Sequence, residues 1–473
     1  MKNYHSNQTC MKPYFIIILT ILWINCTVTS GKTTTETIPE TALMAYMKNN
    51  DKSFKWEIID STQIADVKGY RLHLVSQTWR NITWNHELVV LIPQTLKHNE
   101  ALLHLTGGSE DETTGEIKYH SWEDETIQTM GRIAHNNKAT TAILWQVPRQ
   151  PLFGGRYEDV LVSYTYHQFQ QSGDFTWPLL FPMAKSAVRA MDAISQLAQS
   201  LNTHKKVDRF VVNGVSKRGW TTWMAAATED PRIVAIAPMV IDILNMPVNV
   251  EYQKHMYGDY SIEIKDYVNL GLTETVKRKE GMDLVKMVDP YSYKGKYKLP
   301  KMLFMGTNDE FWTVDAVKNY IDDIPGHKLL TYTPNAGHGL GSKEAAILSL
   351  EAFFYQTIHG KKYPTCTHSA SQKGRMAEIR IKTGKGTLVG VELWEASSET
   401  KDFRKSKFKA TAIPLPRKKS FSIKVNLPEK NFKAFMVMLH YKHPTEQKPY
   451  TICTRMYTSS SDVLYDKPFK PEL

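Results

Sequence analysis

Three residue types that can act together as a nucleophile, a base and an orienting acid occur in one order along the chain. Ser216 comes first, in a glycine-flanked turn, Asp309 follows a later apolar run, and His338 stands between two glycines. Serine is a poor nucleophile until a base takes its proton, and histidine, with a pKa of about 6.5, suits that task. A carboxylate fixes the histidine tautomer and stabilises the imidazolium. The set therefore predicts nucleophilic catalysis by Ser216, with His338 as the base and Asp309 as the orienting acid.

Ser216 is expected on a sharp turn between a strand, residues 209–213, and a helix that starts at Gly219. Glycine at the second position before the serine and at the third position after it would let the strand turn directly into the helix. Serine nucleophiles of α/β-hydrolases occupy this kind of turn, usually with glycine at the second position after the serine. Here that position holds Arg218. A serine that caps the helix N-terminus is the alternative interpretation.

Asp309 and His338 are each expected in the loop that follows a buried strand. Ligands and catalytic groups of open α/β sheets gather at the carboxyl ends of the strands, and the chain order Ser, Asp, His is that of α/β-hydrolases. Each residue also has a plainer interpretation. Asp309 could shape a turn, with Glu310 or Asp242 as the acid instead, and His338 could be an ordinary loop histidine.

Backbone amides that could stabilise the oxyanion of a tetrahedral intermediate are expected at two places. One is the amide of Lys217, directly after the nucleophile. The other is the loop 106–108, which follows an early buried strand and offers Gly107 or Gly108 as the donor. An ordinary tight turn at these two glycines is the alternative.

Buried strands alternate with helices along residues 31–364, which indicates an α/β-hydrolase domain with a doubly wound, mostly parallel sheet. The expected strands are residues 70–76, 87–93, 101–105, 140–147, 209–213, 234–241, 301–306 and 327–333. Helical periodicity is clearest over 127–136, 183–201 and 342–358. Residues 246–299 lack a buried strand, so we interpret them as an insertion, or cap, over the edge of the sheet.

Residues 365–473 have a different pattern, in which short alternating runs are separated by Gly, Pro, Lys and Ser turns. Such a pattern predicts a small sandwich-like β-domain. Cys366 precedes its first expected strand and Cys453 lies in its last. In an oxidising compartment the two would form a disulfide, which is expected to stabilise the domain by about 4 kcal/mol.

The chain has 59 Lys and Arg against 48 Asp and Glu, and the excess lies in the C-terminal region. Residues 365–473 hold 21 basic and 10 acidic residues, and the strip 401–419 interleaves eight basic residues with Phe403 and Phe408. This region could bind a cell-surface receptor or a polyanion. A solvated loop explains the same charge, and no nucleic-acid partner is expected.

Residues 1–30 combine a basic flank, a short apolar core and small residues at the end, as secretory signal peptides do. The core is shorter than the ~20 residues that a membrane-spanning helix needs. Cleavage would remove Cys10 and Cys26 and release an extracellular protein that does not span the membrane. Asn81, in an Asn-Ile-Thr sequon, is the expected glycosylation site. An uncleaved membrane anchor is the alternative.

Several motifs together resemble one known family. They are the runs Asn213–Trp223, Val240–Asn245, Asn308–Trp312, Pro334–His338, Asp289–Tyr291, and Trp394 followed by Asp402–Arg404. Over most of residues 40–457 the chain resembles the PhoPQ-activated pathogenicity-related family, whose secreted eukaryotic relatives include autocrine proliferation repressor proteins. The resemblance implies an α/β-hydrolase of the prolyl-oligopeptidase type followed by a β-domain, with Ser216, Asp309 and His338 as a catalytic triad. It implies no particular substrate.

The leading hypothesis is a secreted serine hydrolase that cleaves an ester or peptide bond of a small substrate through an acyl-enzyme. No H-E-x-x-H, paired-cysteine or phosphate-loop motif occurs, so neither a metal nor a cofactor is expected. The alternative is a secreted signalling protein that represses proliferation and uses the hydrolase scaffold without needing catalysis. A cell-surface polyanion binder is a third hypothesis.

Overall fold

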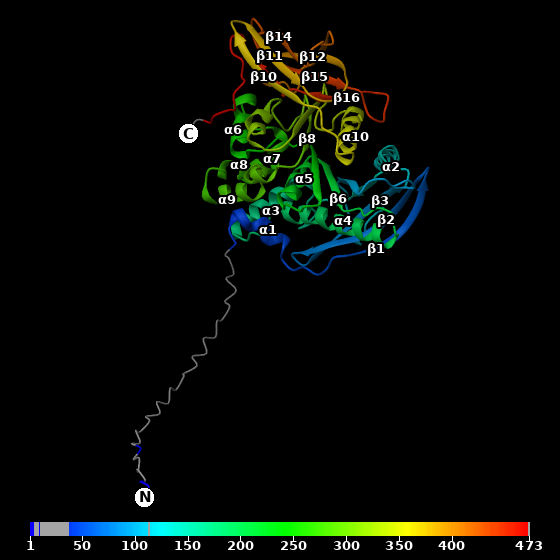
Figure 1. The fold of residues 1–473 in the computed structure, drawn as a ribbon. Helices are drawn as coiled ribbons and strands as arrows, with labels where there is room; N and C mark the ends of the chain where they lie inside the picture. The colour runs from blue at the N-terminus through cyan, green and yellow to red at the C-terminus, as the bar shows by residue number, and fades with distance from the viewer. Residues whose placement is uncertain (4–8, 10–36, 112–113, 472–473) are drawn as a thin grey trace. The chain divides into compact units, whose positions relative to one another are not determined.

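The computed structural model describes residues 1–3, 9, 37–111 and 114–471. The chain divides into two units, residues 1–36 and residues 37–473, and the described helices and strands all belong to the second unit (Figure 1). The expected signal peptide, residues 1–30, and the two cysteines in it lie outside the described residues, apart from residues 1–3 and 9.

A nine-stranded sheet forms the centre of the second unit, with the order β1-β2-β3-β5-β4-β6-β7-β8-β9 (Figure 1). The strands β1 to β3 form an antiparallel meander that joins β5, and from β5 to β9 all neighbours run parallel. The bounds are Lys55–Ile64 (β1), Val67–Trp79 (β2), Ile82–Pro93 (β3), Glu100–Leu105 (β4), Thr140–Leu144 (β5), Arg209–Val215 (β6), Ile233–Met239 (β7), Lys301–Gly306 (β8) and Lys328–Thr333 (β9). The predicted mostly parallel α/β-hydrolase sheet is confirmed.

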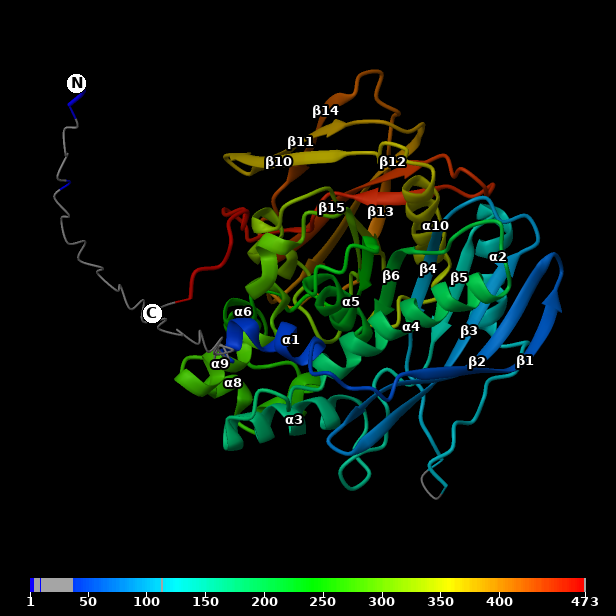
Figure 2. The same ribbon diagram turned by 60° about the horizontal axis from the view of Figure 1, so that its bottom comes forward.

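Helices cover both faces of this sheet (Figure 2). One face packs against α2 and α10, and the other packs against α1, α3, α4 and α5. Their bounds are Pro39–Met47 (α1), Glu125–Asn137 (α2), Glu158–Ser172 (α3), Leu180–Ser200 (α4), Lys217–Ala227 (α5) and Glu344–Ile358 (α10). Within the described ranges, no helix combines the length and the apolar character that crossing a membrane requires. The central strands are buried on both faces. The loops at the carboxyl edge of the sheet therefore start from tightly packed strands.

The segment between β7 and β8, expected to be an insertion, is helical. It contains α6 to α9 and two short 3-10 helices, with the bounds Met246–Tyr257 (α6), Ile262–Ile264 (η1), Lys265–Val268 (α7), Leu272–Thr275 (α8), Lys279–Val288 (α9) and Pro290–Lys296 (η2). Two further 3-10 helices, Ala316–Asn319 (η3) and Ile321–Asp323 (η4), lie between β8 and β9. The inserted helices pack against α1, α3 and α5 through apolar side chains such as Leu284 and Met287.

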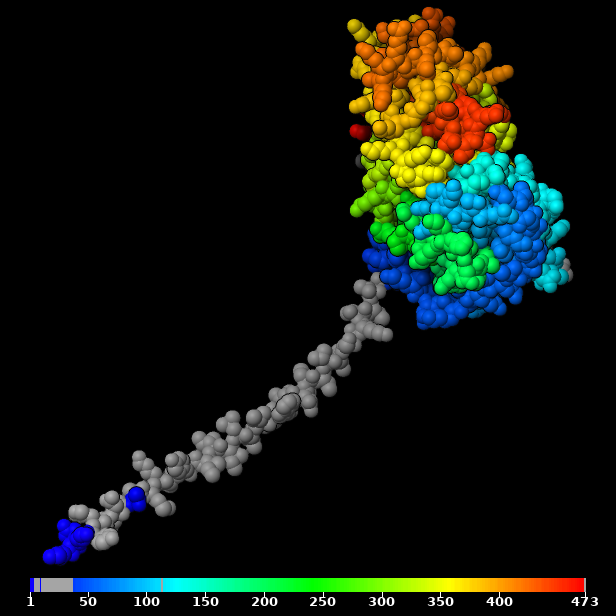
Figure 3. Space-filling view, turned by 45° about the vertical axis from the view of Figure 1, so that its right-hand side comes forward, coloured from blue at the N-terminus to red at the C-terminus, as the bar shows by residue number. Residues whose placement is uncertain are grey.

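After α10 the described chain forms antiparallel strands only. They make a three-stranded sheet, β10-β11-β14, and a five-stranded sheet in which β13-β12-β15-β16 are in order and β17 also pairs with β15. Their bounds are Cys366–Lys373 (β10), Met376–Thr383 (β11), Leu388–Ser398 (β12), Lys409–Ile413 (β13), Ser420–Asn426 (β14), Phe432–Tyr441 (β15), Tyr450–Cys453 (β16) and Tyr457–Ser459 (β17). In Figure 3 these strands (yellow to red) and the β1–β3 meander (blue) lie at opposite ends of the face in view.

The predicted disulfide is not present, because Cys366 and Cys453 are both free thiols. Successive residues of a strand point to opposite faces, and Cys453 shares its face of β16 with its cross-strand partner Met438, on the side toward the hydrolase sheet. Cys366 packs instead with the apolar side chains of the opposite face, which include Ile452. Burial raises the pKa of the Cys453 thiol to about 12.

The predicted hairpin around Asn81 is confirmed. β2 and β3 pair antiparallel up to Trp79 and Ile82, and the two residues between them, Arg80 and Asn81, have φ of 51° and 61°. Two positive φ angles in a two-residue loop are typical of the type I′ turn, which matches the twist of the strands. The Asn81 side chain is exposed at the tip of the hairpin.

Candidate active site

Ser216 occupies a strained backbone turn. β6 ends at Val215, α5 begins at Lys217, and Ser216 between them has φ 59° and ψ −126°. A non-glycine residue in such a conformation costs about 1–3 kcal/mol and persists only where the surrounding structure imposes it. The Ser216 N–H donates to the carbonyl of Met239 in β7 at 2.9 Å, which fixes the turn against the neighbouring strand.

Two glycines allow the helix to start so close to the strand. A Cβ atom on Gly214 would lie 2.5 Å from the carbonyl oxygen of Arg218, and one on Gly219 would lie 2.8 Å from that of Met239. Both distances are shorter than the contacts that Cβ atoms make in proteins. Positions 214 and 219 therefore require glycine, and this explains the two glycines that flank Ser216 in the sequence.

The Ser216 side chain contacts His338. It makes no capping hydrogen bond to α5, so it is not the helix cap of the alternative interpretation. Its Oγ lies 2.8 Å from His338 Nε2, and His338 Nδ1 lies 3.0 and 2.9 Å from the two carboxylate oxygens of Asp309. The three residues follow β6, β8 and β9, so they meet at the carboxyl edge of the sheet.

The two alternative acids have other partners. Glu310 accepts a hydrogen bond from the backbone N–H of His338 at 2.8 Å, so it holds the loop and not the ring. Asp242 accepts from the Tyr320 hydroxyl at 2.6 Å. Burial raises the pKa of Asp242 to about 7, partly opposed by the Tyr320 bond and reinforced by the charge of Asp309. Of the three carboxylates, Asp309 is therefore the one that contacts the imidazole.

Arg218, which stands where glycine is usual, connects the Ser216 turn to Gly107. Its guanidinium donates to the two carboxylate oxygens of Glu158 at 2.7 and 2.5 Å and to the carbonyl of Val147. A Cβ atom on Gly107 would lie 2.7 Å from Arg218 Nη2, so the loop and the side chain are in close contact. Burial alone would raise the pKa of Glu158, but Arg218 and Lys217 hold it well below its usual range. The pair therefore stays ionised.

The expected oxyanion donors stand at the start of a helix and in a fixed loop. Lys217 is the first residue of α5, where backbone N–H groups lack intrahelical partners and the helix dipole is positive. Gly107 accepts from the Gln146 N–H at 3.2 Å, and Gly108 accepts from Gln150 Nε2 at 3.1 Å. The loop is thus held through its carbonyl groups, and the role of its amides as donors stays a prediction.

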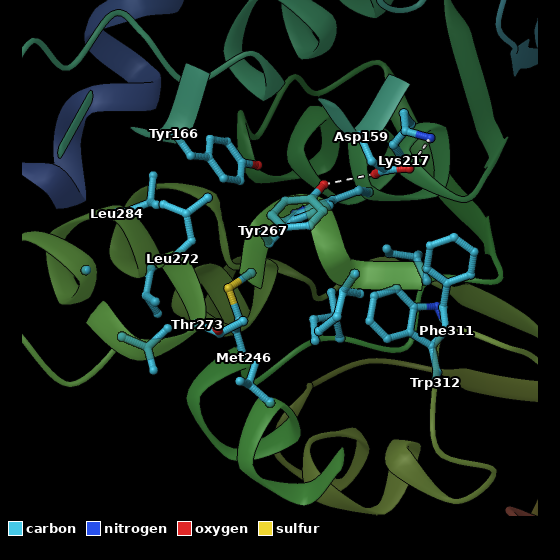
Figure 4. Close-up of a pocket in the computed structure, with 18 of the residues that line it drawn as sticks. Asp159, Tyr166, Lys217, Met246, Tyr267, Leu272, Thr273, Leu284, Phe311 and Trp312 are labelled. Atoms are coloured by element: carbon cyan, nitrogen blue, oxygen red, sulfur yellow. Dashed lines mark hydrogen bonds and ion pairs between the residues drawn. The ribbon is translucent and has the colours of Figure 1, made fainter. Parts of the chain in front are cut away.

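An apolar pocket with a cavity volume of about 70 Å³ lies beside Ser216 (Figure 4). One water needs about 10–15 Å³ on such a scale, so the pocket has room for several non-hydrogen atoms. The charged groups in its wall are paired. Lys217 Nζ lies 2.7 Å from a carboxylate oxygen of Glu158 and 3.0 Å from one of Asp159, and the Tyr267 hydroxyl donates to Asp159 at 2.9 Å.

The C-terminal strands reach the site through the segment 403–408. Asn308 Nδ2 donates to three carbonyl oxygens of this segment, at 3.1, 3.1 and 2.7 Å, which are those of Phe403, Arg404 and Ser406. Asn335 and Phe408 exchange two hydrogen bonds, of 3.0 and 2.7 Å. Because Asn308 adjoins Asp309, the segment helps to hold the loop that carries the acid.

The basic strip 401–419 is not one exposed face. Phe403 and Phe408 are buried in the core with the inner side chains of the hydrolase sheet. Lys401 Nζ donates to a ring nitrogen of His255, and Arg404 pairs with Asp402. The exposed basic residues of the strip are Lys405, Lys407, Lys409, Arg417, Lys418 and Lys419. Binding of a receptor or a polyanion stays a prediction.

The sequence profile of the PhoPQ-activated pathogenicity-related proteins matches residues 43–404, which is more than half of the chain. The chain belongs to the PhoPQ-activated pathogenicity-related family. The matched part contains Ser216, Asp309 and His338 and ends at Arg404, within the segment that contacts Asn308. The resemblance seen in the sequence motifs is thus confirmed.

One relative of this chain is autocrine proliferation repressor protein A of Dictyostelium discoideum. The two are 30% identical over 385 residues, which cover 77% of this chain and 76% of the relative.

Among solved structures, acetyl xylan esterase from Paenibacillus sp. R4 has a TM-score of 0.43 and 12% identity over 66% of this chain and 92% of its own. Acetyl xylan esterase 1 from Thermoanaerobacterium sp. JW/SL YS485 has a TM-score of 0.39 and 17% identity over 63% and 87%. The structural likeness concerns the fold alone.

Helix α3, which the sequence analysis missed, supplies Glu158, Asp159 and Tyr166 to the site. Polar residues such as Ser163 and Thr165 are buried in it among apolar ones, so its sequence has no clear apolar stripe. The sequence signal that could have indicated this helix is the pair of acids at its start, Glu158 and Asp159. Two adjacent acids there would have suggested a pairing with the two adjacent bases Lys217 and Arg218. In the parts of the chain that the structure describes, no group of three or more His, Cys, Asp and Glu side chains could hold a metal ion.

Gly214→Ala is expected to lower the free energy of unfolding by about 3 kcal/mol, because the added Cβ collides with the Arg218 carbonyl. Gly131→Ala in α2 is the matched control. Its Cβ would lie 3.9 Å from Ile64, an ordinary contact, and alanine favours the helix, so stability should rise by about 0.5–1 kcal/mol. Urea unfolding followed by circular dichroism measures both. Equal effects would contradict the close approach at position 214.

Asp242→Asn is expected to change how stability depends on pH. With a pKa of about 7 in the folded state, Asp242 keeps a proton that the unfolded chain releases near pH 4. Its contribution is therefore full below pH 4 and is lost as pH rises toward 7, by about 1.4 kcal/mol per pH unit. Urea unfolding at several pH values should show a loss of stability between pH 4 and 7 that is steeper in the wild type than in Asp242→Asn by this amount, because Asp289, whose pKa burial also raises to about 7, contributes equally to both proteins. Tyr320→Phe removes a bond that lowers the pKa, so it should extend the slope to higher pH; an unchanged slope in both variants would refute the assignment.

Proposed function

We propose that this protein hydrolyses a carboxylic ester through an acyl-enzyme formed on Ser216. The observation that supports the proposal is the chain of hydrogen bonds from Ser216 Oγ to His338 Nε2 and from His338 Nδ1 to Asp309. The Nδ1–H group of the imidazole donates a hydrogen bond to the carboxylate and keeps its proton. The unprotonated Nε2 then faces the serine hydroxyl as a base. Phe311 packs against the His338 ring, with 4.1 Å between ring centroids, and keeps it in place.

In the first half of the reaction, His338 Nε2 takes the proton of the Ser216 hydroxyl while Oγ attacks the ester carbonyl carbon. The negative charge that develops on the carbonyl oxygen is stabilised by the Lys217 N–H and by an amide of Gly107 or Gly108. When the tetrahedral intermediate collapses, the bond to the leaving alcohol breaks and His338 gives its proton to that oxygen. Ser216 is then acylated.

The second half repeats these steps with water. His338 takes a proton from the water, whose oxygen attacks the acyl carbonyl, and the same amides hold the oxyanion. The bond to Ser216 Oγ breaks, Oγ recovers a proton from His338, and the carboxylic acid leaves. Asp309 carries its charge throughout and stabilises the imidazolium that forms twice in each cycle.

The pocket favours an ester of a small acyl group over a polypeptide. It is walled by apolar side chains of α5 and of the inserted helices, among them Trp220, Met246 and Leu284. Its charged wall groups, Lys217 and Asp159, are already paired with each other, so they offer no free charge to a substrate. A compact, uncharged acyl group fits such surroundings. Peptide substrates should therefore be cleaved more slowly than esters of small acyl groups in a substrate screen.

We also propose that the protein acts outside the cell after removal of residues 1–30. Support comes from the signal-peptide pattern of those residues and from Asn81, whose sequon lies at an exposed hairpin tip that a glycan can occupy. The basic residues of the β-domain would then face the polyanions of the cell surface.

The catalytic proposal predicts that a fluorophosphonate probe labels Ser216 in the folded wild type. Ser216→Ala and His338→Ala should remove labelling, because they remove the nucleophile and its base. Asp309→Asn should lower kcat for a 4-nitrophenyl ester by about 10³–10⁴-fold, because the amide no longer fixes the productive tautomer. Mass spectrometry of the labelled peptide and steady-state kinetics measure these effects.

Glu310→Gln is the matched control for Asp309→Asn, since both replace a carboxylate by its amide on adjacent residues. Glu310 contacts only the backbone N–H of His338 among the groups of the triad, and glutamine keeps an acceptor oxygen there. Its kcat should fall by less than about tenfold. A folded wild type that takes up no probe, or a larger loss in Glu310→Gln than in Asp309→Asn, would count against the proposed roles.

A second candidate function is repression of cell proliferation by the secreted protein. The observation in its favour is the 30% identity to autocrine proliferation repressor protein A over 77% of this chain. In this case the hydrolase scaffold could serve as a binding surface, since a fold does not determine its function.

The Ser216→Ala variant separates the two functions. If repression depends on hydrolysis, purified wild-type protein added to the cells that secrete it should slow their growth, and the variant should not. Cell counts over several divisions, with the heat-denatured protein as a control, provide the measurement. Equal repression by the wild type and the variant would assign the biological role to binding.

A further inference from the structure

Two hydroxyls that line the pocket, those of Tyr166 and Thr273, are buried without a hydrogen-bond partner among the described residues. Asp159 and Lys217 form an ion pair, and the Tyr267 hydroxyl donates to Asp159. The Thr273 hydroxyl is close enough to Tyr260 to lower the pKa of that side chain, whereas Tyr166 packs on Trp220, next to the Ser216 turn. The Tyr166 hydroxyl is buried and has no hydrogen-bond partner among the described residues.

The Tyr166 ring is held firmly in this position. It lies on α3 and meets the Trp220 ring edge-on, with 6.1 Å between centroids, and the Tyr267 ring at 6.3 Å. Trp220 stands one helical turn after Ser216, and its backbone N–H donates to the Ser216 carbonyl at 2.9 Å. Figure 4 shows the Tyr166 hydroxyl directed toward the side chains that line the pocket. An acyl group bound to Ser216 and lying along Trp220 would therefore approach Tyr166.

The Tyr166 hydroxyl can act as a donor at any pH at which the protein works. Burial, with a smaller contribution from the charge of Asp159, raises its pKa well above the ordinary value of tyrosine. A buried hydroxyl without a partner is costly, and an acceptor atom supplied by a ligand removes that cost. The same nearby carboxylate disfavours an anionic group there, so the complementary acceptor is neutral.

We propose that the pocket selects an acyl group that is apolar along most of its length and carries a neutral oxygen acceptor near its far end, bonded to the Tyr166 hydroxyl. An oxo, ether or ester oxygen has this chemistry. The proposal rests on the proposed acylation of Ser216 and adds the substrate class. Apolar contacts with Trp220, Ile241 and Leu284 hold the body of the acyl group, and Tyr166 sets its length and polarity.

The experiment compares pairs of 4-nitrophenyl esters of similar size. In each pair the acyl chain carries either an oxo group or a methyl branch at the same carbon, with that carbon at the fourth, fifth or sixth position. For at least one pair the wild type should have a kcat/KM about tenfold higher for the oxo ester, which corresponds to about 1.4 kcal/mol. In Tyr166→Phe this ratio should fall to about one.

Tyr297→Phe is the matched control. Its hydroxyl is also buried without a partner among the described residues, but it packs on Trp223 and does not line the pocket. The variant should keep the wild-type ratio, which excludes a general effect of removing a buried hydroxyl.

The possible outcomes are distinct. If the wild type hydrolyses the branched esters with no oxo preference, or if the preference survives in Tyr166→Phe, the substrate class is refuted while the catalytic proposal stands. A kcat/KM ratio near one for every pair is the result expected if an ordered water is bonded to the Tyr166 hydroxyl, and it refutes the substrate class as well. If the folded wild type hydrolyses none of the esters and Ser216 is not acylated, the catalytic proposal itself fails.

Discussion

The positive φ of Ser216 is the constraint on which the site depends. A serine hydroxyl at the end of a parallel strand can meet a histidine from a later loop only if the backbone turns within one residue, and that turn places L-residues in an unfavourable region. Gly214 and Gly219 make room for it, and the hydrogen bond to Met239 holds it. The burial of β6 and β7 on both faces supplies the rigidity that keeps the strain in place.

Arg218 explains how this protein departs from the usual nucleophile turn without losing it. Its side chain leaves the turn, lies against Gly107 and ends on Glu158. A position that usually holds glycine in such turns is therefore a link between the Ser216 turn and the candidate oxyanion loop. Glu158 begins the helix that carries Asp159 and Tyr166. One charged pair therefore orders the base of the turn, the loop opposite it and one wall of the pocket.

Much of the fold and the three central residues could be predicted, because local patterns carry them. The buried strands are short apolar runs, and Ser216, Asp309 and His338 each follow one. Other features depend on contacts between distant segments. The links of Asn308 and Asn335 to 403–408 have no local signal, and β1 was missed because most of its side chains are exposed. The disulfide prediction was wrong because spacing alone does not tell which face of a strand a cysteine occupies.

Because Asn308 and Asn335 contact the segment 403–408, a chain that ended at α10 would lack part of what holds the candidate site. The last strand of the large sheet ends 70 residues before that segment, yet the loops that carry Asp309 and His338 are both hydrogen-bonded to it. Truncation or proteolysis within residues 365–473 would thus disturb the loops of Asp309 and His338 as well as the surface of the protein. A substitution that displaces these C-terminal strands would thus be felt at the candidate site through the same few hydrogen bonds.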